Sequence, residues 1–419
     1  MSTSSESPAP TSMADRRTLD RDRNSDRSDR DRSDRSDRDR PQRDRPGDTL
    51  AEAATPEIPT FVLPAATTTG IWLPGARDPR RGYIATSPVR EAAATGFDVL
   101  ADQLPPVPLT AHQAEGRWGA DAIGRAVGLL TELHVDRTSY GWRLTASAGK
   151  DERLEDSALI EAFDAIAEYG ASRPGQIQIS LPGPWTLVTA LSLSSGARVL
   201  GDYGARRDVV QAYAFGIAAF TDRIAGLGMQ PTVRLVESRL NPVLTGTWPT
   251  VSGWASLPAI SETQVWAALE STLRHLPPAV LALPNLDPLR LQGKEIPAAE
   301  AVRRTGARSV SVPLASLRAH SWEQLAILAE AGLGTWIKLP TEAGGRSDAV
   351  NHWCERIRTP WSRIGMGVAS LRGFGILAGP ELPMTYPPLL EDQQGIGPER
   401  NRGTMTIAAG LRRALEEIE

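Results

Sequence analysis

The sequence of 419 residues has little that would cross-link the chain or anchor it in a membrane. Its one cysteine, Cys354, excludes a disulfide-stapled fold and any site built from two thiolates of one chain. No run of about 18 apolar residues occurs, so the sequence predicts no transmembrane helix. Because the N-terminus has no apolar secretion segment either, we expect a cytoplasmic protein without a membrane partner.

Lysine is also scarce, and basic charge does not exceed acidic charge. The chain has three lysines, Lys150, Lys294 and Lys338, and its 46 Lys and Arg stand against 50 Asp and Glu. The formal net charge of −4 disfavours a protein that binds nucleic acid through backbone charge. We therefore expect no nucleic-acid partner.

Common catalytic motifs are missing. The sequence contains no GxxxxGK[ST] loop, no GxGxxG at the start of a helix after an early strand, no HExxH, no GxSxG and no CxxC. Hydride transfer on a Rossmann half and P-loop hydrolysis are therefore unsupported.

Residues 1–58 contain almost nothing that could build a core. Residues 1–50 carry 12 Arg against 11 Asp plus Glu6, mostly in Asp-Arg and Ser-Asp-Arg units. Such a polyampholyte buries too little apolar area to offset chain entropy, so we expect disorder. A solvated spacer and a partner- or RNA-binding arm both remain open, although the alternating charges disfavour strong RNA binding.

Residues 59–419 alternate short apolar runs with amphipathic stretches, the pattern of βαβ units. The predicted strands lie near 70–73, 107–110, 177–181, 232–236, 279–283, 308–312, 334–339 and 363–368. Helices are expected near 88–104, 119–133, 156–169, 205–227, 261–276, 297–305, 321–332, 346–357 and 400–417, with an extra ribbon near 134–147. Eight strands favour an α/β fold of the (β/α)8 TIM barrel type over an open doubly wound sheet.

In such a barrel the site lies at the carboxyl ends of the strands. Glu237 directly follows an apolar strand, where it could act as an acid, a base or a cation binder, or form a salt bridge to Arg239 or a helix cap. His112 and Asp287 are the other candidates for proton transfer. The candidates for ligand binding are Trp72, Trp118, Pro182, Gly183, Asn285, Lys338, Ser370 and Arg372.

Several of these candidates have a purely structural alternative. Arg372, with the glycines that follow it, could cradle an anion or simply make a tight turn. The turn at 181–186 could contact a ligand or have a purely structural role. The tryptophans could stack on a flat ligand or pack in the core. Cys354 is expected on a helix as a small, partly buried side chain.

The order of these pieces resembles the C-terminal catalytic barrel of cobalamin-independent methionine synthases, in particular short single-barrel relatives. GIWLPG at 70–75 is similar to the family's GSxPG start, and LPGPWTL at 181–187 to its xPGPxTL turn. The WGAD segment at 118–121 also matches. TVRLVES at 232–238 is similar to the strand that ends in DEP, of which only Glu237 matches. The resemblance covers roughly residues 70–380.

The resemblance implies methyl transfer from methyltetrahydrofolate to homocysteine, with the thiol held as thiolate by zinc. The family's ligands are His-x-Cys, a carboxylate and a final Cys. Leu283 and Asn285 stand at the first pair, the carboxylate position falls near Pro313, and the last Cys falls near Ser370. We therefore expect a degenerate zinc site, no metal ligand and no cofactor.

Three functions follow as hypotheses. The first is a divergent family member that binds a small folate-like or amino-acid ligand. The second is a working methyltransferase with an altered acceptor site, in which Glu237 would bind the acceptor's amine. The third is a non-enzymatic scaffold whose tail at 1–58 binds a partner. The sequence leaves the oligomeric state unknown.

Overall fold

The computed structural model describes residues 62–72, 88–110, 122–171, 173, 175–291, 293–340, 348–381 and 398–418. The chain divides into two units, Met1–Pro56 and Glu57–Glu419, and every described residue belongs to the second. The tail predicted at 1–58, and the site candidates His112 and Trp118, lie outside the described residues.

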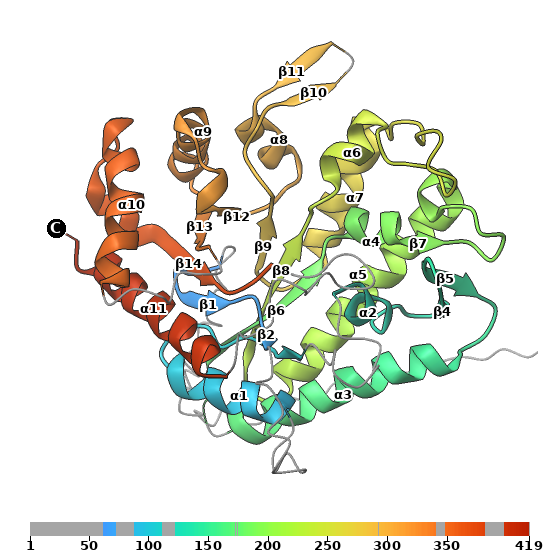
Figure 1. Ribbon diagram of the computed structural model, residues 1–419, viewed down its shortest axis with the longest axis horizontal. Coiled ribbons are helices and arrows are strands. Elements are labelled where there is room, and N and C mark those ends of the chain that lie inside the picture. Colours follow the sequence, from blue (N-terminus) through green and yellow to red (C-terminus); the bar gives the residue numbers. More distant parts are fainter. Residues whose placement is uncertain are drawn as a thin grey trace, which may run out of the picture. The chain divides into compact units, whose positions relative to one another are not determined.

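Seven parallel strands form one sheet in the order β1-β14-β13-β12-β9-β8-β6 (Figure 1). The strands are β1 (Ala66–Thr68), β6 (Gln176–Pro182), β8 (Gln230–Val236), β9 (Ala279–Ala282), β12 (Ser309–Pro313), β13 (Gly334–Lys338) and β14 (Phe374–Ala378). Neighbours in the sheet follow one another in the chain, as expected when each crossover is right-handed and covered by a helix.

The segment 104–110 closes the ring between β6 and β1. The amide of Val107 donates to the carbonyl of Gln178 on β6, and the amide of Leu104 donates to the carbonyl of Ala66 on β1. Farther along, β2 (Ile71–Trp72) pairs in parallel with β3 (Leu109–Thr110). The predicted (β/α)8 barrel is therefore confirmed, with a largely irregular segment in the position of its second strand.

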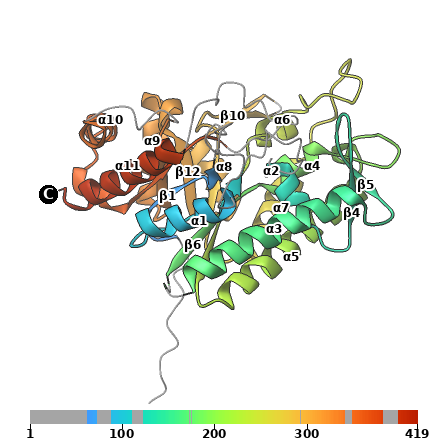
Figure 2. The ribbon, with the colours of Figure 1, turned by 60° about the horizontal axis from the view of Figure 1, so that its bottom comes forward.

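Helices cover the outside of the strand ring (Figures 1 and 2). They are α1 (Pro88–Val99), α2 (Ala122–Val127), α3 (Lys150–Gly170), α4 (Pro184–Ala190), α5 (Tyr203–Ala225), α6 (Leu240–Thr245), α7 (Glu262–Arg274), α8 (Ala298–Arg304), α9 (Ala319–Glu330), α10 (Ala349–Arg363) and α11 (Pro398–Glu416). Short 3₁₀ turns add η2 (Val199–Gly201), η3 (Leu314–Ser316) and η4 (Val368–Gly373). The helices α4 and α6 were not expected from the periodicity.

The strand predicted over 363–368 is wrong. This stretch ends α10 and turns at Gly365, whose φ of 86° is left-handed. The last barrel strand is β14 instead, a run of five residues that are all buried. Gly375 on β14 is a packing glycine, because a Cβ there would lie 2.2 Å from Cδ2 of Trp336.

Apolar side chains fill both sides of the barrel wall. Two large clusters pack the outward faces of the strands against the helices. A third cluster contains Val62, Ala65, Leu104, Val280 and Trp336. These residues come from separate strands and segments of the ring and meet inside it. Among the described residues, the interior at the level of this cluster is thus packed, as is typical of such barrels.

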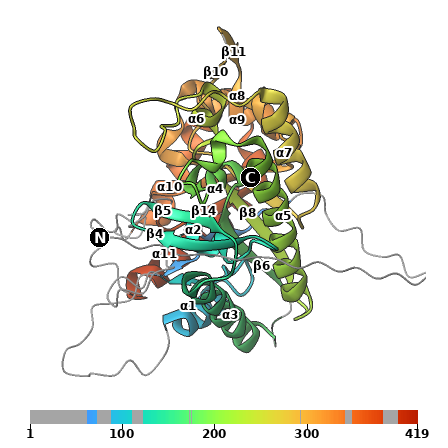
Figure 3. The same cartoon turned by 90° about the vertical axis from the view of Figure 1, so that its right-hand side faces the viewer.

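Two small sheets extend from the barrel. The ribbon predicted at 134–147 is the hairpin β4 (His134–Thr138) and β5 (Gly141–Thr145), with β7 (Leu191–Ser192) beside β5. A hairpin of β10 (Leu289–Leu291) and β11 (Lys294–Ile296) projects after β9 (Figure 3). Within the described ranges, no helix is long and apolar enough to cross a membrane.

Candidate functional site

Arg234 lies in the middle of β8, within the wall of the barrel. It stands opposite Ser180 on β6 and Val280 on β9. Val280 belongs to the interior cluster, and paired residues of parallel strands share a face. The guanidinium of Arg234 therefore lies inside the ring, where the residue is only 3% exposed.

The guanidinium of Arg234 is incompletely satisfied. Its Nε and Nη1 are buried and have no hydrogen-bond partner among the described residues. Burial lowers the pKa of Arg234, and the carboxylate of Glu381 opposes that effect. A buried donor without a partner carries a desolvation cost of about 1–3 kcal/mol, more for a charged group.

Lys338 brings a second cation to the same interior. It ends β13, opposite Leu377 on β14, and is 5% exposed. Its Nζ lies 2.9 Å from Oε1 of Glu381, which follows β14 and has a side chain 54% exposed. Burial lowers the pKa of Lys338, Glu381 raises it, and Arg234 lowers it further. Two buried cations thus share one partly solvated carboxylate.

Polar atoms of neutral side chains accompany this charge. Oε1 of Gln178 and Oγ of Ser311 are buried without a hydrogen-bond partner in the described part of the chain. The amide Nε2 of Gln178 donates to the carbonyl of Thr68 at 3.1 Å. Gln178 and Ser180 are two positions apart on β6, so their side chains point to the same side. Both therefore face the interior, as Arg234 does. The barrel interior therefore offers cations, acceptors and a hydroxyl together.

Glu237 stands outside the ring, just after β8, and is fully buried. Its Oε1 accepts the amide N–H of Trp185, and its Oε2 accepts both the amide N–H and the hydroxyl of Thr186. Burial raises the pKa of Glu237 to about 7, against the lowering effect of these hydrogen bonds and of Arg239. The side chain thus ties β8 to the start of α4, which favours a structural role.

A small cavity of about 50 Å³ brings Glu237 together with Asn285 and Asp287. The rest of its wall comes from α6, α7, β9, β10, α8 and adjoining loops and is apolar except for Asn241 and Thr305. Both Asn285 and Asp287 are exposed, and the side chain of Asn285 accepts the amide N–H of Asp287. The volume suits a few water molecules rather than a folate-sized ligand. The roles in proton transfer therefore remain predictions.

Pro182 and Gly183 form the turn between β6 and α4. The carbonyl of Pro182 accepts a hydrogen bond from the hydroxyl of Tyr213, and Gly183 lies against Glu237. Trp72 is buried in the cluster between the strands and the helices. These three residues serve packing in this structure, and contact with a ligand remains a prediction for each.

Ser370 and Arg372 do not lie where the sequence placed them. Both belong to η4 and precede β14, so they stand at the amino end of the last strand rather than its carboxyl end. Ser370 Oγ accepts the indole N–H of Trp361, and Arg372 Nε donates to the carbonyl of Ile418. The premise for an anion site at Arg372 and its glycines is therefore wrong.

The zinc that the resemblance implies does not fit the residues present. Leu283, Asn285 and Pro313 offer no thiolate or imidazole, and Asn285 is exposed. The position after the last strand now falls on residues 379–381, Gly-Pro-Glu, where Glu381 already pairs with Lys338. Within the described ranges, no group of three or more His, Cys, Asp or Glu could hold a metal ion. Cys354, the only cysteine, lies on α10.

Of the two interior cations, sequence reasoning identified Lys338 and missed Arg234. The signal for Arg234 was available. It is the one charged residue in the run TVRLV, and alternation in a barrel strand places position 234 on the same face as 232 and 236.

Comparison with known proteins gives only distant similarity. No family model matches the chain, and no curated protein matches it. A B12-independent methionine synthase from a Shewanella species, solved with selenomethionine, is similar with 12% identity and a TM-score of 0.47, over 85% of this chain and 98% of that one. A broad-specificity endoglucanase from Clostridium longisporum gives 9% identity and a TM-score of 0.30, over 71% and 99%. Both superpositions are loose, so neither assigns this chain to a family.

Proposed function

We propose that this chain binds a small carboxylate ligand, folate-like or an amino acid, at the carboxyl-end mouth of its barrel. We further propose that it is a divergent member of the cobalamin-independent methionine synthase family that lacks the zinc–thiolate chemistry. The observation that carries the ligand proposal is Arg234, a buried guanidinium whose Nε and Nη1 have no partner among the described residues.

The charges favour a carboxylate as the ligand group. Arg234 and Lys338 supply two buried positive charges, and Glu381 supplies one negative charge from a half-exposed side chain. A guanidinium matches a carboxylate in a two-pronged arrangement, and such charge-assisted bonds are about twice as strong as neutral ones. A ligand carboxylate would therefore satisfy the free donors of Arg234 and balance the second cation.

The family proposal rests on the motif pieces. The turn at 181–186 and Glu237 carry the most specific parts of the resemblance, and three hydrogen bonds join them in the structure. Their contact supports common ancestry of this region. Because the zinc ligands do not fit, we propose no catalytic step that passes through a metal.

Calorimetric titration of the full chain with methyltetrahydrofolate, homocysteine and glutamate tests the ligand proposal. We expect binding of at least one of them, weakened about tenfold or more by Arg234→Met. Arg290→Gln is the matched control, because Arg290 lies on the exposed β10–β11 hairpin. Failure of all three ligands to bind, or equal weakening by both variants, would refute the proposal.

Elemental analysis and a methyl-transfer assay test the loss of zinc chemistry. We expect no stoichiometric zinc and no transfer from methyltetrahydrofolate to homocysteine. About one zinc per chain together with turnover would instead establish a working methyltransferase with a different metal shell.

A further inference from the structure

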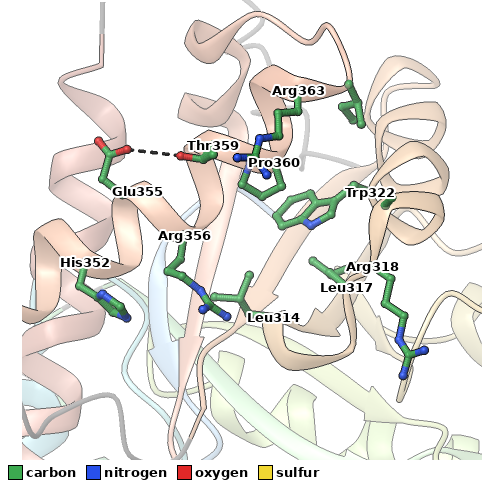
Figure 4. Close-up of a pocket in the computed structure, with 12 residues that line it drawn as sticks. Leu314, Leu317, Arg318, Trp322, His352, Glu355, Arg356, Thr359, Pro360 and Arg363 are labelled. Carbon is green, nitrogen blue, oxygen red and sulfur yellow. Dashed lines mark hydrogen bonds between the residues drawn. The ribbon is translucent and has the colours of Figure 1, made fainter.

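A groove of about 540 Å³ lies between α9 and α10, outside the strand ring (Figure 4). Its volume is within the range of small-molecule sites, roughly 300–1,000 Å³. It shares no lining residue with the interior group of Arg234 and Lys338. The two places are therefore separate candidates for ligand binding.

The floor of the groove combines apolar surface with one free donor. Leu314, Leu317 and Ile364 contribute aliphatic carbon, and Trp322 contributes its indole. Trp322 is 3% exposed, and Figure 4 shows its indole nitrogen directed toward Leu314 and Leu317. This N–H donates to no acceptor among the described residues, unlike that of Trp361, which donates to Ser370. This nitrogen is not among the fully buried polar atoms without a partner, so water or a ligand in the groove can reach it.

The walls of the groove are cationic. Arg356 and Arg363 lie seven positions apart on α10 and so share a face, and Arg318 precedes α9 on the opposite side. None of the three has an ion-pair partner in the described part of the chain. Figure 4 draws the guanidinium of Arg356 next to Leu314, while the indole of Trp322 lies nearer to Pro360.

The one acidic residue of the lining does not neutralise these arginines. Glu355 Oε1 lies 2.6 Å from Nη2 of Arg358, which is on α10 but outside the groove. Its Oε2 accepts a weak hydrogen bond from Thr359 at 3.5 Å. The groove therefore retains an excess of three positive charges, and His352 stands at its edge.

A proline interrupts the backbone hydrogen bonding of α10 beside the groove. Pro360 lies inside α10 and lines the groove. Having no N–H, it cannot donate to the carbonyl of Arg356, and its ring bends a helix away from ideal geometry.

We propose that the groove between α9 and α10 is a second binding site, for a small organic phosphate. The phosphate would accept hydrogen bonds from the indole N–H of Trp322 and from the guanidinium of Arg356. The carbon part of the ligand would pack on Leu314, Leu317 and Ile364. The three arginines of the lining favour a dianion over a monocarboxylate, because they carry more positive charge than one carboxylate can balance. This proposal is independent of the one for the barrel mouth.

The test follows the indole N–H signal of Trp322 by nitrogen–proton correlation NMR on the full chain, with 1-naphthyl phosphate as the probe. Trp322→Phe assigns this signal among those of the 11 tryptophans. We expect the probe to shift the Trp322 signal at concentrations at which 1-naphthylmethanol does not. Arg356→Gln should weaken binding about tenfold or more.

Arg290→Gln is the matched control, since it removes an exposed arginine whose ion-pair partner, Glu295, does not line the groove. Arg234→Met should also leave binding of the naphthyl compound unchanged, which separates this site from the barrel mouth. Because Arg356 is exposed, Arg356→Gln keeps the fold even if Trp322→Phe does not. An equal shift with 1-naphthylmethanol, no shift at all, or equal weakening by Arg356→Gln and Arg290→Gln would overturn the proposal.

Discussion

The carboxylate of Glu237 occupies the space that a side chain at position 183 would need. A Cβ built on Gly183 would lie 2.3 Å from Cδ of Glu237. The backbone of Gly183 is extended, with φ −69° and ψ 161°, so close approach rather than conformation requires glycine here. The carboxylate cannot easily retreat, because Trp185 and Thr186 hold both its oxygens.

Gly183→Ala is therefore expected to destabilise the fold by about 1–3 kcal/mol, since the methyl group must displace a buried, hydrogen-bonded carboxylate. Urea denaturation measures the change. Gly373→Ala is the control, because a Cβ there meets nothing within 4 Å. Similar losses in both variants would mean that the contact with Glu237 is not the cause.

The pKa of Glu237 predicts a pH dependence of stability. Burial raises it from 4.5 to about 7, so between these values the folded chain holds a proton that the unfolded chain releases. The free energy of unfolding should then fall as pH rises through this window, by up to about 1.4 kcal/mol per pH unit. Denaturation of wild type and Glu237→Gln at several pH values should show a shallower slope in the variant. Parallel slopes would contradict the assignment.

The pair of Lys338 and Glu381 predicts a stability that depends on anions. Glu381→Gln leaves Lys338 and Arg234 as two buried cations without a carboxylate, which is costly. We expect the Tm to fall by several degrees, because each kcal/mol of lost stability lowers the Tm of a domain of this size or somewhat smaller by roughly 2–4 °C. Acetate should restore part of the lost Tm. Glu295→Gln, in an exposed pair with Arg290, is the control. An acetate effect of the same size in both variants would argue against the interior site.

Ser370 is expected to matter for packing and not for ligand binding. Its hydroxyl accepts the indole N–H of the buried Trp361 at 2.9 Å and donates to the carbonyl of Gly367. Ser370→Ala should cost about 1 kcal/mol of stability because the indole donor is left unpaired. Calorimetric titration of Ser370→Ala with the ligands used for Arg234→Met should show unchanged affinity. A clear loss of affinity would mean that Ser370 takes part in ligand binding.

The barrel itself was largely predictable because each strand carries its own signal. Strands that are buried on both faces are continuous apolar runs, and β6, β8, β9, β12 and β13 were recognised on that basis. The prediction failed at the last strand because two apolar runs, at 363–368 and 374–378, are separated by only a few residues. Helix α10 extends to Arg363 by packing against α11 and η4, and this contact lies outside any local pattern.

The sequence by itself determined the α/β barrel, the absence of paired thiolates and the position of Lys338 at a strand end, because these follow from local composition and strand periodicity. Tertiary structure alone decided which side of the barrel wall each polar residue faces. Arg234 and Glu237 are three positions apart on the same strand and its extension, yet the pleat directs one into the barrel and the other into the helix layer. The same physics separates a buried cation with unpaired donors from a buried carboxylate that fixes a turn.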